Sequence, residues 1–450
     1  NVLLNADNDY QSVVFNTAQK NQVDASFGGG SDNLKYFLSS GYLNETGILD
    51  NTSYDRITAR LNADYNATKR LNFSTRVNIN YAKKKGTDEA NFLNTILARK
   101  PNLSFYYPDN TLIGTLWGAN PIALSEQTNF TDTYGGSFYQ SGEIKITPSI
   151  NFTTSFNANL ALSRYKFMRP SFLFSGAQTN SGSSISNLNW NWMNENYFNY
   201  TKTINKVHTF TGLLGVSAQG WKTESDRFSG RNSATDKIYT MNAFSANFNL
   251  AATRTEEAAH TLASAFSRFG YNYKSKYLFT ASLRADGSSK FSENNRWAYF
   301  PSGAFAWNFG KEKFMKNLKF ISNSKLRLSY GITGNNRISD FSRLQSLDIS
   351  DYYAINGGAP LYAILPNNLG NSDISWEKTS QFDAGLELSF FKDRINLTVD
   401  AYKKVTDDLL LNANIPLSTG YNTVYKNIGK IQNTGLEFTL STLNVKTKNF

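Results

Sequence analysis

The strongest constraint on the fold is an alternation of apolar and polar residues that returns in one segment after another. Between Tyr54 and Ala67 nearly every second residue is apolar and the residues between them are polar, and Tyr277–Asp286 repeats the pattern. A period of two is the period of a β-strand, whose successive side chains point to opposite faces of a sheet. The sequence therefore predicts an all-β protein whose sheet has one apolar face and one polar face.

The connections between the predicted strands alternate between tight turns and long loops. Tight turns are expected at 31–33, 68–70, 148–149, 205–206, 275–276 and 392–394. Long loops are expected after Lys85, where Asn91–Arg99 has the pattern of a short helix, and near 167–188, 224–260, 337–375 and 412–426. Outer-membrane barrels have this arrangement, because only a closed sheet pairs every strand backbone group within hydrocarbon. We predict a transmembrane antiparallel β-barrel with short periplasmic turns and long extracellular loops.

The predicted strands number about 15, an odd count, whereas bacterial single-chain barrels have even numbers of strands. The chain also opens at Asn1 without an initiator methionine or a signal peptide. We therefore expect residues 1–450 to be one incomplete barrel domain of a longer protein. A soluble sandwich or β-solenoid is the alternative. Predicted strands such as Leu71–Lys85 are long for that class, and no repeat of about 20–50 residues is found.

The composition argues against an enzyme and against nucleic-acid binding. Lys and Arg outnumber Asp and Glu by 46 to 35, but the basic residues are scattered and form no stripe on one element. There is no cysteine, and the two histidines, His208 and His260, lie in no metal-binding or nucleophile motif. Adjacent acids such as Asp407 and Asp408 would point to opposite faces of a strand, which is poor geometry for acid–base chemistry. We expect no catalytic site, no metal and no cofactor.

The candidate site residues fall into two sets. Charged residues on the polar strand face would line the lumen of the predicted barrel, where most of them would form structural ladders or contact a plug: Arg60, Arg76, Arg284, Arg327, Asp383, Glu387 and Asp400. Aromatic residues in the predicted long loops are candidates for substrate binding: Tyr106, Tyr107, Trp117, Trp190, Tyr352 and Tyr353. Their rings could bind the C–H face of a sugar or a peptide side chain, and they could equally pack the loops together.

A further aromatic set lies at the ends of predicted strands, where outer-membrane barrels carry girdles that contact the lipid interface. This set comprises Tyr277, Phe300, Trp307, Tyr330, Trp376, Phe390 and Phe391. Outer-membrane lipid is accordingly an expected partner of the chain.

Several segments together carry a family resemblance. They include Lys35–Tyr42 (KYFLSSGY), Arg284–Pro301, Lys325–Asn335 (KLRLSYGITGN), Trp376–Thr379 (WEKT) and Asn433–Glu437 (NTGLE). In these segments and in their order, the chain resembles the SusC/RagA-type TonB-dependent outer-membrane transporters of Bacteroidetes.

The resemblance implies a barrel of about 22 strands, of which about 15 are present here. It also implies an N-terminal plug domain, energy supplied by the TonB–ExbB–ExbD complex through that plug, and a SusD-like surface lipoprotein as a lid. The implied activity is import of oligosaccharides or peptides, without making or breaking bonds. The plug and the C-terminal strands would lie outside these 450 residues. A passive porin and a surface adhesin remain the alternatives.

Overall fold

The computed structural model describes residue 4 and residues 6–86, 89–115, 118–173, 180–244, 252–353 and 361–445. Contacts between residues divide the chain into two compact units. The first unit comprises Asn1–Ser141, Phe156–Trp192 and Trp221–Ala259, and the second comprises Gly142–Ser155, Met193–Gly220 and His260–Phe450. The two units are described separately below.

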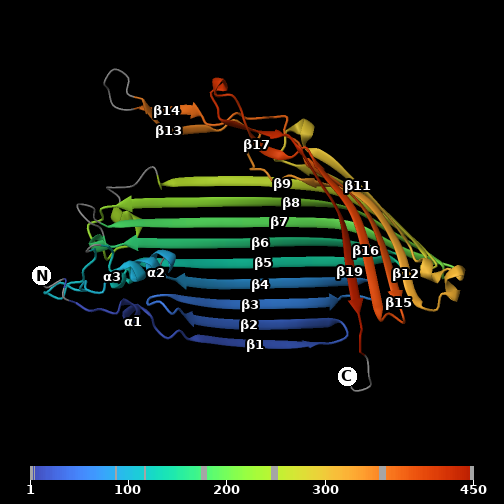
Figure 1. The fold of residues 1–450 in the computed structure, drawn as a ribbon, viewed down its shortest axis with the longest axis horizontal. Coiled ribbons are helices and arrows are strands. Elements are labelled where there is room, and N and C mark those ends of the chain that lie inside the picture. The colour runs from blue at the N-terminus through green and yellow to red at the C-terminus, as the bar shows by residue number, and fades with distance from the viewer. Residues whose placement is uncertain are drawn as a thin grey trace. The chain divides into compact units, whose positions relative to one another are not determined.

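The dominant element is a 15-stranded antiparallel sheet in which the strands follow one another in chain order (Figure 1). Its strands are β1 Lys20–Gly30, β2 Leu34–Thr46, β3 Ser53–Asn66, β4 Leu71–Lys85, β5 Thr128–Thr147, β6 Ile150–Arg169, β7 Ser181–Ile204, β8 His208–Arg231, β9 Arg254–Tyr273, β10 Tyr277–Ser288, β11 Trp297–Trp307, β12 Ile321–Asn335, β15 Glu377–Phe390, β16 Ile395–Asp407 and β19 Lys430–Thr442. The predicted all-β class and strand count are confirmed.

The register of the strands separates an apolar face from a polar face, as the alternation predicts. In the first unit Ala59 lies opposite Ile79 on one face, and Arg60 lies opposite Asn78 on the other. In the second unit Leu386 lies opposite Val399. No described residue packs over the apolar face of the first unit at Ile79, whose side chain is 60% exposed. Such a long exposed apolar face is unusual for a chain surrounded by water and is expected for one surrounded by lipid.

The tight turns have the backbone conformation that antiparallel hairpins prefer. Asn205 and Lys206 between β7 and β8 have φ of 51° and 58°, and Lys274 and Ser275 between β9 and β10 have φ of 51° and 53°. Two successive left-handed residues make a type I′ turn, whose twist matches that of the flanking strands. These turns therefore fix the register of the long hairpins, and they lie within one residue of the predicted positions.

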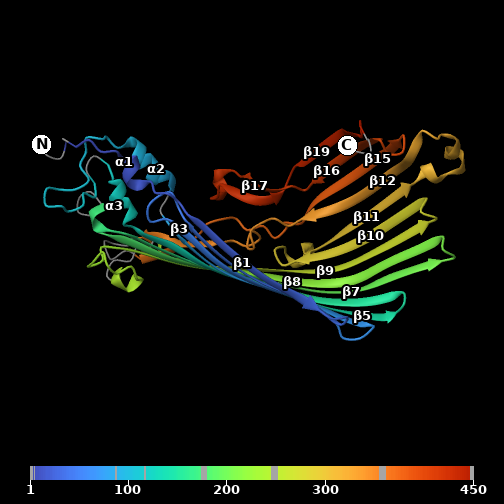
Figure 2. The same ribbon diagram turned by 90° about the horizontal axis from the view of Figure 1, so that it is seen from below.

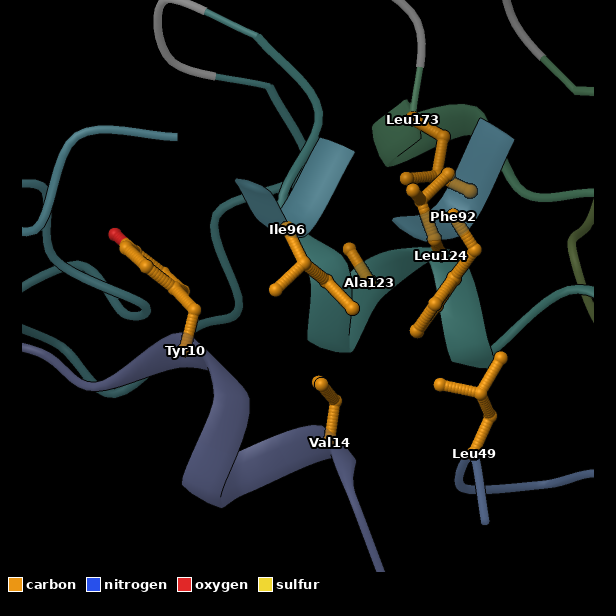
Figure 3. Packing of buried hydrophobic residues seen from close by; sticks show 8 residues of the cluster. All are labelled: Tyr10, Val14, Leu49, Phe92, Ile96, Ala123, Leu124 and Leu173. Atoms are coloured by element: carbon orange, nitrogen blue, oxygen red, sulfur yellow. The ribbon is translucent and has the colours of Figure 1, made fainter. Parts of the chain in front are cut away.

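The long loops of the first unit share a small hydrophobic core. Its helices are α1 Tyr10–Val14, α2 Glu89–Ala98, α3 Pro121–Ser125 and η2 Ser171–Leu173, and α1, α2 and α3 lie close together (Figure 2). The helix expected at Asn91–Arg99 is thus confirmed. Val14, Ile96, Ala123 and Leu124 point toward one another from three of these helices (Figure 3). We name this cluster, with Tyr10, Leu49, Phe92 and Leu173, the loop core.

The loops of the second unit contain two small hairpins and several short 3-10 helices. The hairpins are β13 Leu347–Tyr353 with β14 Leu361–Pro366, and β17 Leu410–Asn414 with β18 Thr423–Asn427. The 3-10 helices are η5 Glu293–Asn295, η6 Phe309–Lys311, η7 Lys313–Asn317 and η8 Leu417–Thr419, and the first unit adds η3 Met241–Phe244. Among the described residues, no helix is both long enough and apolar enough to cross a membrane.

A second hydrophobic cluster corrects part of the predicted aromatic girdle. Phe300 and Trp376 are only 8% and 5% exposed, because they pack with Phe291 beneath the loops of the second unit. The indole N–H of Trp376 donates a hydrogen bond to the Arg296 carbonyl oxygen over 2.9 Å. The prediction that these two residues face the lipid interface is therefore wrong, whereas Tyr330 (50% exposed) and Phe391 (56%) are exposed.

The two faces of β16 predict different responses to an added charge. Val399 lies on the apolar face opposite Leu386, and Thr398 lies on the polar face opposite Glu387. In the full-length protein, Val399→Arg should destabilise the state folded into lipid vesicles by about 2–4 kcal/mol if residue 399 lies near the midplane of the bilayer. Thr398→Arg should cost much less, because its guanidinium meets water and a carboxylate. Equal costs at the two positions would contradict the assignment of the faces.

Candidate functional site

Arginine side chains on the polar face of the first unit are held by neighbouring strands. The Arg76 guanidinium contacts the Asp64 carboxylate of β3 at 2.6 Å and donates a second bond to the Ala63 carbonyl oxygen at 2.9 Å. The Arg60 Nε atom donates to Asn78 Oδ1 at 2.8 Å. Both predicted residues are therefore part of cross-strand bonds between β3 and β4, on the same face of the sheet.

Arg327 connects three strands on the polar face of the second unit. From β12 its guanidinium contacts Glu387 of β15 at 2.6 Å and Asp400 of β16 at 2.9 Å. Gly385 lies between Arg327 and Asp400 in the register. A Cβ atom at this position would lie 2.8 Å from an Arg327 nitrogen and would also collide with the Asp400 carboxylate. The missing side chain therefore opens the path along which the guanidinium reaches a strand beyond its neighbour.

The remaining predicted residues of the polar face also have partners. Arg284 contacts Asp286 of its own strand at 2.7 Å and donates to Ser264 Oγ at 2.8 Å. Asp383 accepts a bond of 2.9 Å from the Gln381 side-chain amide. Every residue of the predicted polar set thus forms an ion pair or hydrogen bond within its own unit, and none gathers into a group suited to acid–base or nucleophilic chemistry.

Tyr106 and Tyr107 lie in the loop between β4 and β5, as predicted. They are 44% and 40% exposed, so their rings are accessible. The Tyr107 amide donates to the Thr111 carbonyl oxygen at 2.9 Å, and Asn110 has a left-handed φ of 64° that closes this turn. Phe105, next to them, instead packs against Tyr10 of the loop core. The two tyrosines are therefore presented on a short turn anchored by a buried neighbour.

The placement of Trp190 in a long loop is wrong. Strand β7 begins at Ser181, several residues before the predicted end of the loop, and Trp190 lies within it. Its side chain lies on the apolar face with Trp192 and Leu160. Of the other loop aromatics, Trp117 lies outside the described residues, and Tyr352 and Tyr353 lie on β13, with side chains outside the described part.

A charged cluster in the second unit has no signal in the sequence. The Asp340 carboxylate lies 3.0 Å from His260 Nδ1 and 3.3 Å from Lys290 Nζ, and Lys290 also donates to the Ile338 carbonyl oxygen at 2.9 Å. The side chains of Asp340, His260 and Lys290 are only 12%, 24% and 13% exposed, respectively. They come from β9 and from two separate loops, so only the folded chain brings them together.

Asp236 joins two long loops of the first unit. Its carboxylate accepts hydrogen bonds from the Ser171 backbone N–H at 2.9 Å, the Ser171 hydroxyl at 2.6 Å and the Asn180 side-chain amide at 2.8 Å. Burial raises the pKa of Asp236, but the bonds from Ser171 and Asn180 outweigh it, so the pKa lies below its usual range. The charged carboxylate therefore holds the loop after β6 against the loop after β8.

A long antiparallel sheet with one exposed apolar face, a polar face whose side chains pair with one another, and loop clusters at its long connections has the architecture of a transmembrane β-barrel. The family model described as "TonB dependent receptor-like, beta-barrel" matches residues 97–447. The chain therefore belongs to the TonB-dependent receptor β-barrel family, and the resemblance to its SusC/RagA type is confirmed.

The relatives are longer than this chain. It is 36% identical to TonB-dependent receptor P39 of Formosa agariphila over 447 residues, which are 98% of the chain and 42% of that receptor. It is 28% identical to TonB-dependent receptor SusC of Bacteroides thetaiotaomicron over 99% of the chain and 47% of that receptor. The fold matches a RagAB peptide transporter structure with a TM-score of 0.81 at 22% identity, covering 97% of this chain and 50% of that one.

The bridge made by Arg327 predicts that the polar face contributes to stability. In the full-length protein, Arg327→Gln should lower the free energy of unfolding by about 1–2 kcal/mol, because Glu387 and Asp400 then lose their shared cation at partly exposed positions. Urea unfolding in short-chain lipid measures the change. Adding Glu387→Gln and Asp400→Asn should restore much of the loss, since neutral amides no longer need the cation. A triple variant no more stable than the single one would contradict this cause.

The Asp236 bonds predict a loop that loosens in acid. A folded-state pKa below the usual value means that the stabilisation is complete above the ordinary carboxyl pKa and is lost as the pH falls through the lower folded value. Asp236→Asn should reduce the hydrogen-exchange protection of the Ser171 backbone amide at neutral pH. The exchange rate should rise by roughly the factor that corresponds to the loss of a hydrogen bond worth 1 kcal/mol. The wild type and the variant should converge in acid. Asp393→Asn, in a turn, is the matched control and should leave Ser171 unchanged.

Proposed function

We propose that this chain is the middle part of the barrel of an active importer in the outer membrane. The supporting observation is membership of the TonB-dependent receptor β-barrel family over residues 97–447, together with the exposed apolar face of the sheet. Because the chain spans less than half the length of the P39 and SusC receptors, the activity of the whole protein is part of the proposal. The strands cross the outer membrane several times, and the long loops face outward.

The proposed partners are a SusD-like surface lipoprotein and the TonB–ExbB–ExbD complex, which would act through a plug domain on the same polypeptide. The relative named SusC and the RagAB peptide transporter, which shares the fold, support this part of the proposal. The proposed substrates are oligosaccharides or peptides. No bond of the substrate is made or broken.

The polar face fits such substrates in a specific physical way. Three of its four predicted arginines are paired with carboxylates: Arg327 with Glu387 and Asp400, Arg76 with Asp64, and Arg284 with Asp286. A lumen lined by such pairs offers many hydrogen-bond donors and acceptors but little unpaired charge. Neutral polar chains, such as glycans and peptide backbones, can exchange hydrogen bonds with this wall without a large electrostatic barrier. Tyr106 and Tyr107 are the exposed loop aromatics proposed to contact substrate outside the lumen.

Uptake in cells separates an active importer from a passive pore. We expect cells with the full-length gene to take up a fluorescent oligosaccharide mixture or peptide mixture, and expect uptake to stop when TonB is deleted. Surface binding should persist in the TonB-deleted cells, because the loops remain in place. Uptake that continues without TonB would indicate a porin, and binding without uptake under any condition would indicate an adhesin.

The loop tyrosines supply a variant for the same assay. Replacing Tyr106 and Tyr107 by Ala should weaken surface binding, whereas replacing the two turn residues Lys69 and Arg70 by Ala should not. Unchanged binding in the tyrosine variant would remove these residues from the proposal without affecting the transport mechanism.

A further inference from the structure

One arginine on the polar face of the second unit has no carboxylate partner. Arg268 of β9 lies opposite Ser282 of β10, and its side chain is exposed. Among the residues that the structure describes, no carboxylate lies within 4.0 Å of it. Arg284, two residues along β10 on the same face, contacts Asp286 at 2.7 Å and shows the contrast. Arg268 is therefore a cation that the described part of the sheet leaves without a counter-charge.

The positions around Arg268 on this face carry no negative charge. Phe266 and Gly270 flank it on β9, and Leu213 of β8 lies beside it. The Asp286 carboxylate stands four residues along β10 from the level of Arg268, which is about 13 Å, and it is already bonded to another arginine. An anionic group that approaches Arg268 is therefore attracted by the guanidinium without repulsion from an adjacent carboxylate.

A hollow of about 300 Å³ extends from Arg268 across the polar face of the next four strands. These strands are β10, β11, β12 and β15, which lie side by side in the sheet (Figure 2). Ala304 and Gly331 keep the floor of the hollow low, because neither has a side chain beyond Cβ. The volume is at the lower end of the range for small-molecule sites, about 300–1,000 Å³. Six lining residues carry a hydroxyl group: Thr280, Ser282, Ser302, Ser329, Thr333 and Thr379.

The hollow is bounded along the strands at both ends. Toward the long loops, Phe300 follows Ser302 on the same face of β11 and is buried against Trp376. Toward the tight turns, the ion pair of Arg327 with Glu387 crosses the same face. The hollow is therefore a defined site on the polar wall and not part of a uniform surface.

The hydroxyl groups of the hollow keep hydrogen-bonding capacity for a ligand. Ser282 and Ser302 share one hydrogen bond of 2.5 Å, and Thr379 shares one of 2.9 Å with Thr406. A hydroxyl group can donate one hydrogen bond and accept two, so each of these groups has capacity left. The described lining offers no aliphatic side chain longer than that of alanine. It therefore suits a ligand that is polar on all its edges, as a sugar ring is, better than an apolar peptide side chain.

The opposite end of the hollow carries the carboxylate of Asp383. This carboxylate accepts a hydrogen bond of 2.9 Å from the Gln381 side-chain amide, and Lys404 lies opposite Gln381 on the same face. Four strand spacings separate Asp383 from Arg268, which is about 19 Å across the sheet. A chain with acidic groups along its whole length would bring one of them close to Asp383. The charges therefore favour a ligand with one acidic group at the Arg268 end and a neutral remainder.

We infer that the hollow binds an oligosaccharide that carries a single acidic sugar. The sugar carboxylate meets the Arg268 guanidinium, and neutral sugar residues lie along the hydroxyl groups toward β15. A guanidinium can donate two parallel hydrogen bonds to a carboxylate, which gives this contact both strength and direction. The inference rests on the proposed function, because it specifies which of the proposed substrates the polar wall selects.

Uptake by cells with the full-length gene tests the inference with a matched pair of compounds. The acidic compound is xylotriose with one 4-O-methylglucuronic acid, and the neutral compound is the same molecule after reduction of its carboxylate to the alcohol. At low concentration, wild-type cells should take up the acidic compound about tenfold faster, the factor for one charge-assisted hydrogen bond. Arg268→Gln should abolish this preference without changing uptake of the neutral compound. Arg268→Lys should keep part of the preference, because the charge remains.

Two control variants separate the site from the fold. Arg254→Gln removes an arginine of the same strand that contacts Glu256 at 2.8 Å outside the hollow, and it should keep the preference. Ala304→Leu fills the floor of the hollow and should lower uptake of the acidic compound. Ala281→Leu adds the same side chain on the apolar face of β10, opposite Gly303, and should leave uptake unchanged.

Equal uptake of the two compounds by the wild type, or an Arg268→Gln variant that retains the preference, would overturn the inference. Equal loss of both compounds in Arg268→Gln would assign Arg268 to the structure of the barrel or its plug and would also overturn it. A wild type that takes up an acidic tetrapeptide but neither saccharide would refute the saccharide site and leave the proposed importer intact. A preference that persists when TonB is deleted would refute the active importer and keep the saccharide site.

Discussion

The need to pair every backbone N–H and C=O group within hydrocarbon determines the rest of this structure. A strand cannot satisfy these groups alone, so each strand takes its partners from the strands before and after it in the chain. Type I′ turns such as Asn205–Lys206 keep consecutive strands in one register. Once the register is set, every second residue is assigned to one face, and the two faces can have opposite chemistry. The backbone therefore supplies the scaffold, and the side chains are free to meet lipid on one side and water on the other.

The polar face shows how charges are placed on such a scaffold without destabilising it. Each cation of the predicted set has a partner on its own strand or on a strand close by, and Arg327 reaches a strand beyond its neighbour because Gly385 has no side chain. An unpaired charge among these half-buried side chains would be costly, whereas a paired one leaves dipoles and hydrogen-bonding groups on the surface. The same contacts thus stabilise the sheet and leave a hydrophilic surface with little unpaired charge.

Local pattern was enough to predict the strands, the turns and the facing of the sheet, because period-two alternation and turn residues act within a few positions of one another. Ala59 with Ile79 and Arg60 with Asn78 follow from that alternation once the hairpin is closed. The errors lie where distant segments decide the outcome. Phe300 and Trp376 have the pattern of interface residues, but loops far away in sequence bury them.

Trp190 illustrates a different limit. The residues before it are mostly polar and hide the start of β7, so the sequence predicts a loop where the structure has a strand. The cluster of Asp340, His260 and Lys290 had no pattern at all, since it forms only when a strand and two loops meet. The loop tyrosines Tyr106 and Tyr107 were placed correctly because their loop is bounded by two clear strands.

The loop core has a consequence for how proteins of this kind diverge. Its residues come from the segment before β1, from the β2–β3 connection at Leu49, from both helices of the β4–β5 loop and from the β6–β7 loop at Leu173. Replacing one of these segments alone would leave a hole or a clash in the shared interior, as in any close-packed core. The segments that form the loop core must therefore change together. Recombination that exchanges the whole set can change the loop surface while the strands stay as they are.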